Sequence, residues 1–360
     1  MANFSATMKK VFVDGVWETF CKKWVWETFF VAWIYQAFYR TFLCKKLHFD
    51  KWKAWVYLSP AIILLLIFTV WPIINTVRIS FLEGYDRNSE IGGMTFEFGL
   101  GNFQKVLAYK YFLDCLKNTL ILCVLTVPIS TFLALLIAVC LNAIKPLNRF
   151  FQTIFFLPYV TNSIAIGMVF ASMFNIVGSQ IGYENEIIQT EGIINNFLGL
   201  FGVKRINFVN EGSSYAANIT VMVIYIVWNA LPFKILILLG GLQSVNKQYY
   251  EAAKIDGTPR WRVFTKITVP LLSPMIAYVV ITGFIGGFKE YSSIVGVFGG
   301  VNNKMGPKDD PKRLNTMVGF IYDSIKANQG LASAAALILF GIIFVVTMIN
   351  LYVSKKKTHY

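Results

Sequence analysis

The sequence is poor in charge and almost lacks histidine. Charged residues make up 14% of the 360 residues, where a soluble protein carries about a quarter, and 56% of the residues are hydrophobic. This balance excludes an ordinary water-soluble domain. The two histidines, His48 and His359, are too few for a histidine-based metal or catalytic cluster. We therefore predict no metal site and no catalytic residue.

Two further signatures are missing. None of the five cysteines forms a Cys-x-x-Cys pair, and Cys123 and Cys140 lie inside one apolar run, so we interpret the cysteines as small apolar residues. No Gly-x-x-x-x-Gly-Lys-Ser/Thr phosphate loop occurs in the sequence. If ATP drives this protein, another chain must bind the nucleotide.

What the sequence does contain is a series of long apolar runs. A helix crosses a membrane with about 20 apolar residues. Six segments are long enough: 54–77, 116–141, 150–176, 216–241, 271–288 and 331–353. We therefore predict an all-α integral membrane protein whose six-span domain covers residues 54–360. Prolines inside the spans predict kinks, which membrane helices tolerate.

The basic residues set the expected orientation. The formal net charge of +14 comes from Lys and Arg residues that cluster beside the apolar runs, which indicates membrane topology rather than nucleic-acid binding. These clusters precede the first span, follow the second and fourth spans, and form the C-terminal tail. With six spans they share one side, so both termini are predicted to be cytoplasmic. The loop at 289–330 fits this orientation least well, because it holds Lys304, Lys308, Lys312 and Arg313.

The first 53 residues contain the pentapeptide VWETF twice, in a stretch rich in Trp, Phe and Lys. We interpret residues 1–53 as an amphipathic helical extension that lies in the cytoplasmic interface. The alternative is a seventh span over 24–43, which would carry Glu27 and Arg40 and place the N-terminus outside. A secretory signal peptide is not expected, because no small-residue cleavage site follows the aromatic stretch.

The loop between the fourth and fifth spans, residues 242–270, has a readable local pattern. Residues 249–255 are expected to form a short helix, and Gly257 suits the left-handed turn that ends it. Thr258 is a suitable N-cap and Pro259 a suitable first residue for a second helix. The loop is thus predicted to place a helix, a sharp turn and another helix across the cytoplasmic face.

The same loop carries a spaced motif. Glu251-Ala252-Ala253 is followed after three residues by Gly257, after nine more by Ile267, and then by Val269-Pro270. This pattern resembles the EAA loop of permeases in binding-protein-dependent ABC importers, with Val269 in place of the usual leucine. Other segments, such as LKNTL at 116–120 and VWNALPFKILILLGGLQ at 227–243, resemble the sugar permeases of the maltose and glycerol-phosphate type.

The resemblance implies a division of labour in a bacterial or archaeal cell (inner) membrane. Such a permease pairs with a second, homologous permease, two ATPase subunits bind to the EAA loops, and an extracytoplasmic binding protein delivers the solute. The chain itself would be a transport subunit and not an enzyme. It would hold no cofactor, because ATP and Mg²⁺ bind to the ATPases. The residues expected to couple to the ATPase are Glu251, Ala252, Ala253, Gly257, Arg260 and Pro270.

The solute pathway is expected on the fourth and fifth spans. With a rise of about 1.5 Å per residue, Asn229 and Gly283 both lie near the middle of the membrane. Trp228 and Phe233 would offer aromatic faces to a sugar, and Asn229 would offer an amide to its hydroxyls. The alternative for Asn229 is a bond to a neighbouring helix. Carrying over the solute-contacting positions of the family completes the set: Trp228, Asn229, Ala230, Phe233, Gly283, Gly287, Glu290 and Ser292.

Three of the residues on these spans have a simpler interpretation. Gly283 and Gly287 have the Gly-x-x-x-Gly spacing that favours close helix packing. Glycine also replaces polar residues of the maltose-type permeases at these two positions, which leaves the identity of the solute open. Lys234 lies near the inner face, its side chain is long enough to extend the ammonium group to the cytoplasm, and we assign it no function.

Other functions fit the sequence less well. The alternative within transport is an ABC permease for a non-sugar solute, such as an osmolyte, an amino acid or a phosphorylated polyol. A membrane-embedded enzyme would show clustered His, Asp or Glu inside the spans, and the six apolar runs hold no such cluster. A channel would have no role for an EAA loop.

Overall fold

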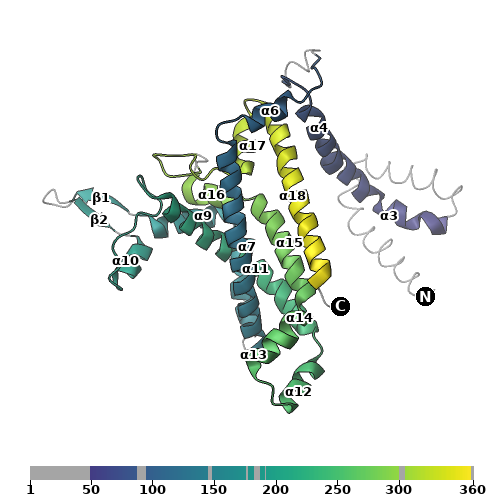
Figure 1. Cartoon of the computed structure of the whole chain (residues 1–360), viewed down its shortest axis with the longest axis vertical. Helices are drawn as coiled ribbons and strands as arrows, with labels where there is room; N and C mark the ends of the chain where they lie inside the picture. Colours follow the sequence, from purple (N-terminus) through teal and green to yellow (C-terminus); the bar gives the residue numbers. More distant parts are fainter. Residues whose placement is uncertain are drawn as a thin grey trace, which may run out of the picture. The chain divides into compact units, whose positions relative to one another are not determined.

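The computed structural model describes residues 49–86, 95–144, 148–175, 177–181, 187–190, 192–299 and 305–357. The chain forms two compact units, Met1–Asn75 and Thr76–Tyr360, which are described separately. Most of the predicted N-terminal extension, and with it the alternative span over 24–43, lies outside the described residues. Figure 1 labels the elements in chain order.

The described part of the first unit belongs to a continuous helical run. It comprises α3 (Phe49–Leu65), the π-turn η3 (Leu66–Val70) and the beginning of α4 (Trp71–Ser80). The π-turn lies just before Pro72, whose ring crowds the carbonyl four residues earlier and removes an N–H donor, so the helix widens there. Residues 55–80 are long and apolar enough to cross a membrane. The first predicted span therefore has the required length.

The second unit is a helical bundle with one small β-hairpin. Its hairpin strands, β1 (Val177–Ile181) and β2 (Ile187–Thr190), pair antiparallel with an irregularity in register. Its longer helices are α7 (Phe112–Ala143), α8 (Asn148–Val160), α9 (Ser163–Phe174), α11 (Tyr215–Ser244), α15 (Ser273–Phe288) and α18 (Gln329–Lys357). Its shorter elements are α6 (Gly101–Leu107), α10 (Ile193–Gly199), α12 (Lys247–Ile255), α13 (Arg260–Val263), η4 (Phe264–Thr268), α14 (Val269–Leu271), α16 (Ser292–Ile294), η5 (Val295–Gly299) and α17 (Met317–Ile325).

The helical membrane fold is confirmed, with the short hairpin of β1 and β2 as an addition that was not predicted, whereas the number of spans stays a prediction. Among the described residues, four helices are long and apolar enough to cross a membrane. A fifth span results if the helices over 260–271 and 273–288, bent by 67° at their junction, count as one. The predicted third span over 150–176 is divided into α8 and α9. The break lies at Asn162, whose side-chain oxygen accepts hydrogen bonds from the N–H groups of Ile164 and Ala165 and so starts a new helix.

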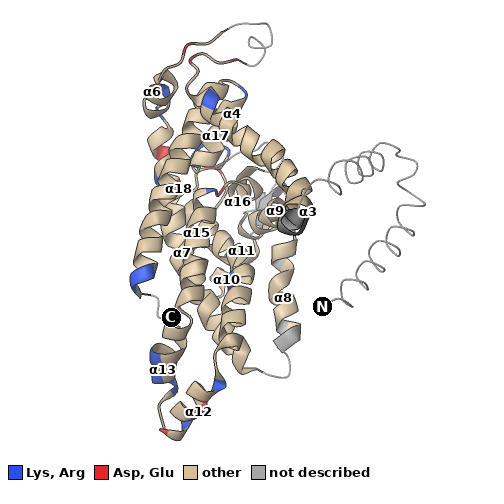
Figure 2. Ribbon diagram, turned by 90° about the vertical axis from the view of Figure 1, so that its right-hand side faces the viewer, with Lys and Arg blue, Asp and Glu red and all other residues tan. Residues whose placement is uncertain are grey.

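The core of this unit follows α7 and α11, which pack along much of their lengths. One buried cluster includes Leu122 of α7 with Met222 and Tyr225 of α11, and another includes Ala138 of α7 with Leu238 of α11. In Figure 1, α12 and α13 lie at one end of the bundle and α17 at the other. Lys and Arg residues gather on α12 and α13 in Figure 2. We call these the α12 end and the α17 end.

Candidate functional site

The α12 end contains the loop that carries the EAA-like motif. The Asn246 side chain starts α12 by accepting a hydrogen bond from the N–H of Gln248 at 3.0 Å. Gly257 follows the helix with a φ of +65°, so the predicted left-handed turn is confirmed. The N–H of Thr258 then bonds the carbonyl of Ala253 at 2.9 Å. The next helix begins at Arg260 and not at Pro259, so the predicted boundary was wrong by one residue.

The two faces of α12 differ sharply. Ala253 is buried, and the Tyr250 hydroxyl lies 3.4 Å from the Thr268 hydroxyl, so this face rests on η4. On the other side Glu251 and Ala252 are exposed. Exposed apolar side chains stand nearby, with Ile255 at 86% exposure and Trp261 of α13 at 73%. Such exposed apolar groups mark a surface that another molecule covers.

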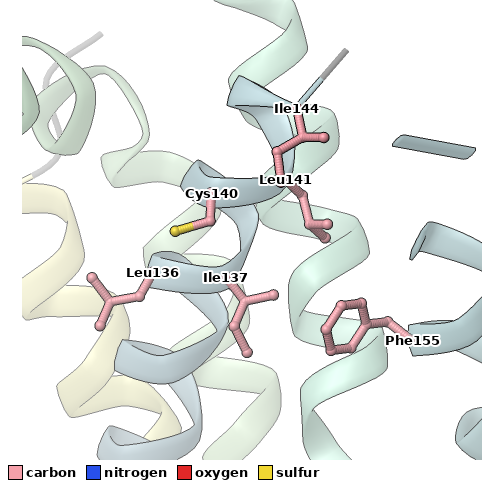
Figure 3. A pocket seen from close by; sticks show the side chains of 6 residues that line it. All are labelled: Leu136, Ile137, Cys140, Leu141, Ile144 and Phe155. Carbon is pink, nitrogen blue, oxygen red and sulfur yellow. The ribbon is translucent and has the colours of Figure 1, made fainter. Parts of the chain in front are cut away.

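Two hollows lie near this end of the bundle. One, of about 330 Å³, is lined only by apolar residues of α7 and α8, which Figure 3 shows: Leu136, Ile137, Cys140, Leu141, Ile144 and Phe155. It offers no hydrogen-bonding side chain to a sugar. The other, of about 610 Å³, lies between the ends of α7 and α11 and the loop, and its lining includes Tyr250, Lys254 and Arg260. The loop therefore does not close tightly against the helix ends.

The residues predicted to contact solute on α11 occupy one partly exposed stretch. Trp228, Asn229, Ala230 and Phe233 are all half-buried, in a helix about half of whose residues are buried. The Trp228 ring lies 5.2 Å from the Phe170 ring of α9, and Phe233 stacks on Tyr159 of α8 at 5.9 Å. Within the described part of the chain, the Asn229 side chain forms no hydrogen bond. Its amide is available to a ligand or a partner.

The break between α8 and α9 is the part of this site that sequence reasoning missed. Tyr225 of α11 donates its hydroxyl to the carbonyl of Ser163, the first residue of α9. This contact brings the beginning of α9 against α11, three residues before Trp228. Tyr159, just before the break, is 52% exposed. The polar triplet Thr-Asn-Ser at 161–163, inside an apolar run and after Pro158, was the signal that could have revealed it.

The two glycines on α15 lie elsewhere. A Cβ atom at Gly287 would lie 2.8 Å from the Cys123 sulfur of α7, and one at Gly283 would lie 3.1 Å from Val127. These glycines therefore let α15 approach α7 closely, as the Gly-x-x-x-Gly spacing suggests. The structure does not bring them together with Trp228 and Phe233.

Lys234 corrects an expectation. Its side chain is only 4% exposed, and its ammonium group donates to Ser130 Oγ at 2.6 Å and to Thr131 Oγ1 at 3.0 Å on α7. The expected extension to the cytoplasm was wrong, because hydroxyl acceptors on the neighbouring helix are within reach of the ammonium group.

Glu290 and Ser292 lie just beyond α15. The Glu290 carboxylate accepts a hydrogen bond from the N–H of Ser293 at 3.2 Å, and its carbonyl accepts one from the Thr316 hydroxyl at 2.9 Å. Burial raises the pKa of the Glu290 carboxyl above its ordinary value. Ser292 is exposed at the start of α16. Glu290 therefore contacts the segment before α17.

The α17 end is held by the LKNTL segment of α7. Asn118 donates to the carbonyls of Arg313 and Asn315, both at 3.0 Å, and accepts from the Tyr215 hydroxyl at 2.7 Å. Thr119 accepts from the N–H of Met317 at 3.0 Å. These bonds fasten the segment before α17 to α7 and α11.

Comparison with known proteins identifies the family to which this architecture belongs. Residues 111–359 match the family described as the binding-protein-dependent transport system inner membrane component. The lactose transport system permease protein LacF of Rhizobium radiobacter is 27% identical, over 84% of this chain and 94% of that protein. The arabinooligosaccharides permease protein AraP of Halalkalibacterium halodurans is 32% identical, over 83% and 87%.

A solved structure shares the fold. It is that of a bacterial alginate ABC transporter in complex with a periplasmic protein that holds an alginate pentasaccharide. The matched chain is 22% identical with a TM-score of 0.68, over 86% of this chain and 97% of that chain. Together with the family match, the apolar helices and the loop after α11, this leads to one conclusion. The chain belongs to the inner membrane permease components of binding-protein-dependent transport systems, and it is a membrane-spanning transport subunit rather than an enzyme.

Proposed function

We propose that this chain forms half of the translocation pathway of an ATP-driven importer for a sugar or oligosaccharide. The observation that carries the proposal is the half-buried stretch of α11 that holds Asn229 between Trp228, which packs on α9, and Phe233, which packs on α8. Relatives named for lactose and for arabinooligosaccharides support a sugar as the solute.

The proposed chemistry suits a polyhydroxylated ring. Aromatic faces pack against the C–H surface of a sugar, and an unpaired amide donates to one hydroxyl and accepts from another. Broken helices at mid-membrane depth supply backbone groups to solutes in other transporters. Tyr159, just before the break, would add an exposed aromatic face to the contribution of α11.

We also propose the partners. A second homologous permease would complete the pathway, and an extracytoplasmic binding protein would deliver the solute. Two ATPase subunits would bind ATP and Mg²⁺, one of them against the exposed face of α12.

The loop residues have separate roles in that contact. Glu251 and Ala252 lie on the exposed face of α12, Gly257 sets the angle of the turn, and Arg260 begins the next helix. Pro270 lies in α14, directly after η4. Both termini would face the cytoplasm of a bacterial or archaeal cell.

The alternative solute is a phosphorylated polyol. One relative, the sn-glycerol-3-phosphate permease protein UgpA of Agrobacterium fabrum, is 29% identical over 85% of this chain. Transport of a sugar would depend on aromatic faces, whereas transport of a phosphate ester would depend on cationic groups or backbone N–H donors.

The test is uptake by the complete transporter. The chain is purified with its associated subunits, these are identified by mass spectrometry, and the complex is reconstituted in vesicles with its binding protein. ATP-dependent uptake is then measured for labelled mono- and oligosaccharides and for glycerol phosphate. We expect saccharide uptake. Uptake of glycerol phosphate alone would overturn the sugar assignment, and co-purification without any ATPase would overturn the importer assignment.

The pathway residues are tested in the same vesicles. Asn229→Ala removes a hydrogen-bonding partner of the solute, which is expected to cost about 1–3 kcal/mol and to lower uptake about tenfold. The control is Thr282→Val on α15, since the Thr282 hydroxyl donates only to carbonyls of its own helix. Loss of subunit assembly in Asn229→Ala, with the control intact, would show that Asn229 is a packing residue.

A further inference from the structure

Lys234 joins two helices at the level of their prolines. It lies two residues after Pro232 of α11. Its three acceptors on α7 are Val127 O, Ser130 Oγ and Thr131 Oγ1, which flank Pro128 in the sequence. The three distances are 3.3, 2.6 and 3.0 Å. An ammonium group has three N–H donors, so each donor has an acceptor. A proline within a helix removes one backbone hydrogen bond, and both helices are therefore weakened where the lysine links them.

Packing alone does not account for a lysine at this position. Within the described part of the chain, no carboxylate forms an ion pair with Lys234. A charged side chain inside a membrane is costly, whereas a methionine of similar length would fill the same space at no such cost. A Cβ atom on Gly283 of α15 would lie 3.2 Å from the ammonium nitrogen, so this glycine leaves room for the group.

The position of Lys234 around α11 connects it to the pathway face. At about 100° per residue, Phe233 lies about 100°, Trp228 about 120° and Asn229 about 140° around α11 from Lys234, so all three point away from the side that contacts α7. The contacts agree with this geometry, because Trp228 and Phe233 meet α9 and α8 while Lys234 meets α7. Fixing Lys234 on α7 therefore fixes which way the opposite face points.

We propose that Lys234 is a positioning residue. Its bridge to α7 sets the rotation of α11 next to the Pro232 kink, so that Trp228, Asn229 and Phe233 face the break between α8 and α9. This inference rests on the proposed function, because that face is the proposed solute pathway. The ammonium group acts through its hydrogen bonds and does not itself contact the solute.

The test combines a double-mutant cycle with a local probe. The variants are Lys234→Met, the pair Ser130→Ala with Thr131→Val, and the combination of all three, in the reconstituted transporter. Lys234→Met is expected to lower the solute carried per ATP hydrolysed about tenfold, while stimulation of ATP hydrolysis by the binding protein persists. The combination should be no worse than Lys234→Met alone. Lys234→Gln, which keeps two donors, should lie between wild type and Lys234→Met, and Thr282→Val should match wild type.

The local probe is a cysteine at position 229, in a chain whose native cysteines are replaced. We expect a water-soluble thiol reagent to modify Asn229→Cys, and Lys234→Met to change the rate of modification. If the cysteine reacts at the same rate with and without Lys234→Met, the positioning role alone would be overturned. Strictly additive losses of transport in the double-mutant cycle would also overturn it. A cysteine that is unreactive in both backgrounds would overturn the proposed pathway, and the positioning role with it.

Discussion

The α12 end and the α17 end of the bundle are completed in different ways. At the α12 end, a short helix rests on the chain through one buried alanine and a long hydroxyl contact, and exposes Ile255. At the α17 end, Leu314 is fully buried and buried side-chain bonds from Asn118 and Thr119 hold the backbone around it. The segment before α17 is held by bonds within the chain, whereas the weakly held, exposed face of α12 indicates a partner. Substitutions at the two ends should therefore fail in different assays.

The largest expected effect is on transport, from a turn at the α12 end. Gly257→Val places a β-branched residue at a φ of +65°, which strains the turn by about 1–3 kcal/mol and changes the angle between α12 and α13. We expect uptake to fall about tenfold while the binding protein still associates. Glu251→Lys, which reverses a charge on the exposed face of α12, should have a similar effect.

Gly212 supplies the matched control for that change. It has a φ of +73°, and a Cβ atom added at Gly212 would have no neighbour within 4 Å, as is true at Gly257. Gly212 differs in its place, because it lies in the loop before α11. Gly212→Val should therefore carry the same backbone strain without the loss of uptake. Equal losses in both glycine variants would mean that general instability, and not the α12 turn, lowers transport.

The next effect is on stability, at the α17 end. Asn118→Ala leaves the carbonyls of Arg313 and Asn315 and the Tyr215 hydroxyl without this partner, at a cost of about 1–3 kcal/mol for each group that is buried and left unpaired. We expect the purified subunit to unfold at a temperature several degrees lower. Thermal unfolding in detergent measures this, with Thr282→Val as the control. An unchanged midpoint would contradict the view that this end is held by the LKNTL segment.

The sequence predicts local features of this molecule better than contacts between distant segments. The long apolar runs were readable because a membrane helix needs only length and apolar composition, and Gly257 was readable because a positive φ is a local requirement. The bonds of Asn118 were not, since its partners lie 195 and 197 residues away. Lys234 was misread for the same reason, because its acceptors belong to another helix.

The break at Asn162 is a different kind of miss. A single cap residue redirects the chain within an apolar run, and hydropathy averaged over the run does not register three polar residues. The candidate solute residues on α11 could be assigned to one short stretch of that helix, but at about 100° per residue they spread over about 200° around it, so spacing alone does not place them on one face. Their aromatic neighbours on α8 and α9 required the three-dimensional structure, because no sequence pattern connects Phe233 with Tyr159.

The smallest effect on stability is expected at the most exposed apolar residue of the α12 end. Ile255→Ser replaces a side chain that is 86% exposed, so it should change the unfolding free energy of the isolated subunit by no more than about 0.5 kcal/mol. Association with the ATPase should nevertheless weaken, because an apolar group that a partner covers loses about 25 cal/mol for each Å² no longer buried.

Leu314→Ser at the α17 end should show the reverse, a large loss of stability with no loss of ATPase binding in the protein that remains folded. Thermal unfolding of the subunit and co-purification of the ATPase, measured on both variants, separate the two outcomes. If Ile255→Ser destabilised the isolated subunit as much as Leu314→Ser does, the exposed face of α12 would belong to the fold of this chain rather than to a partner.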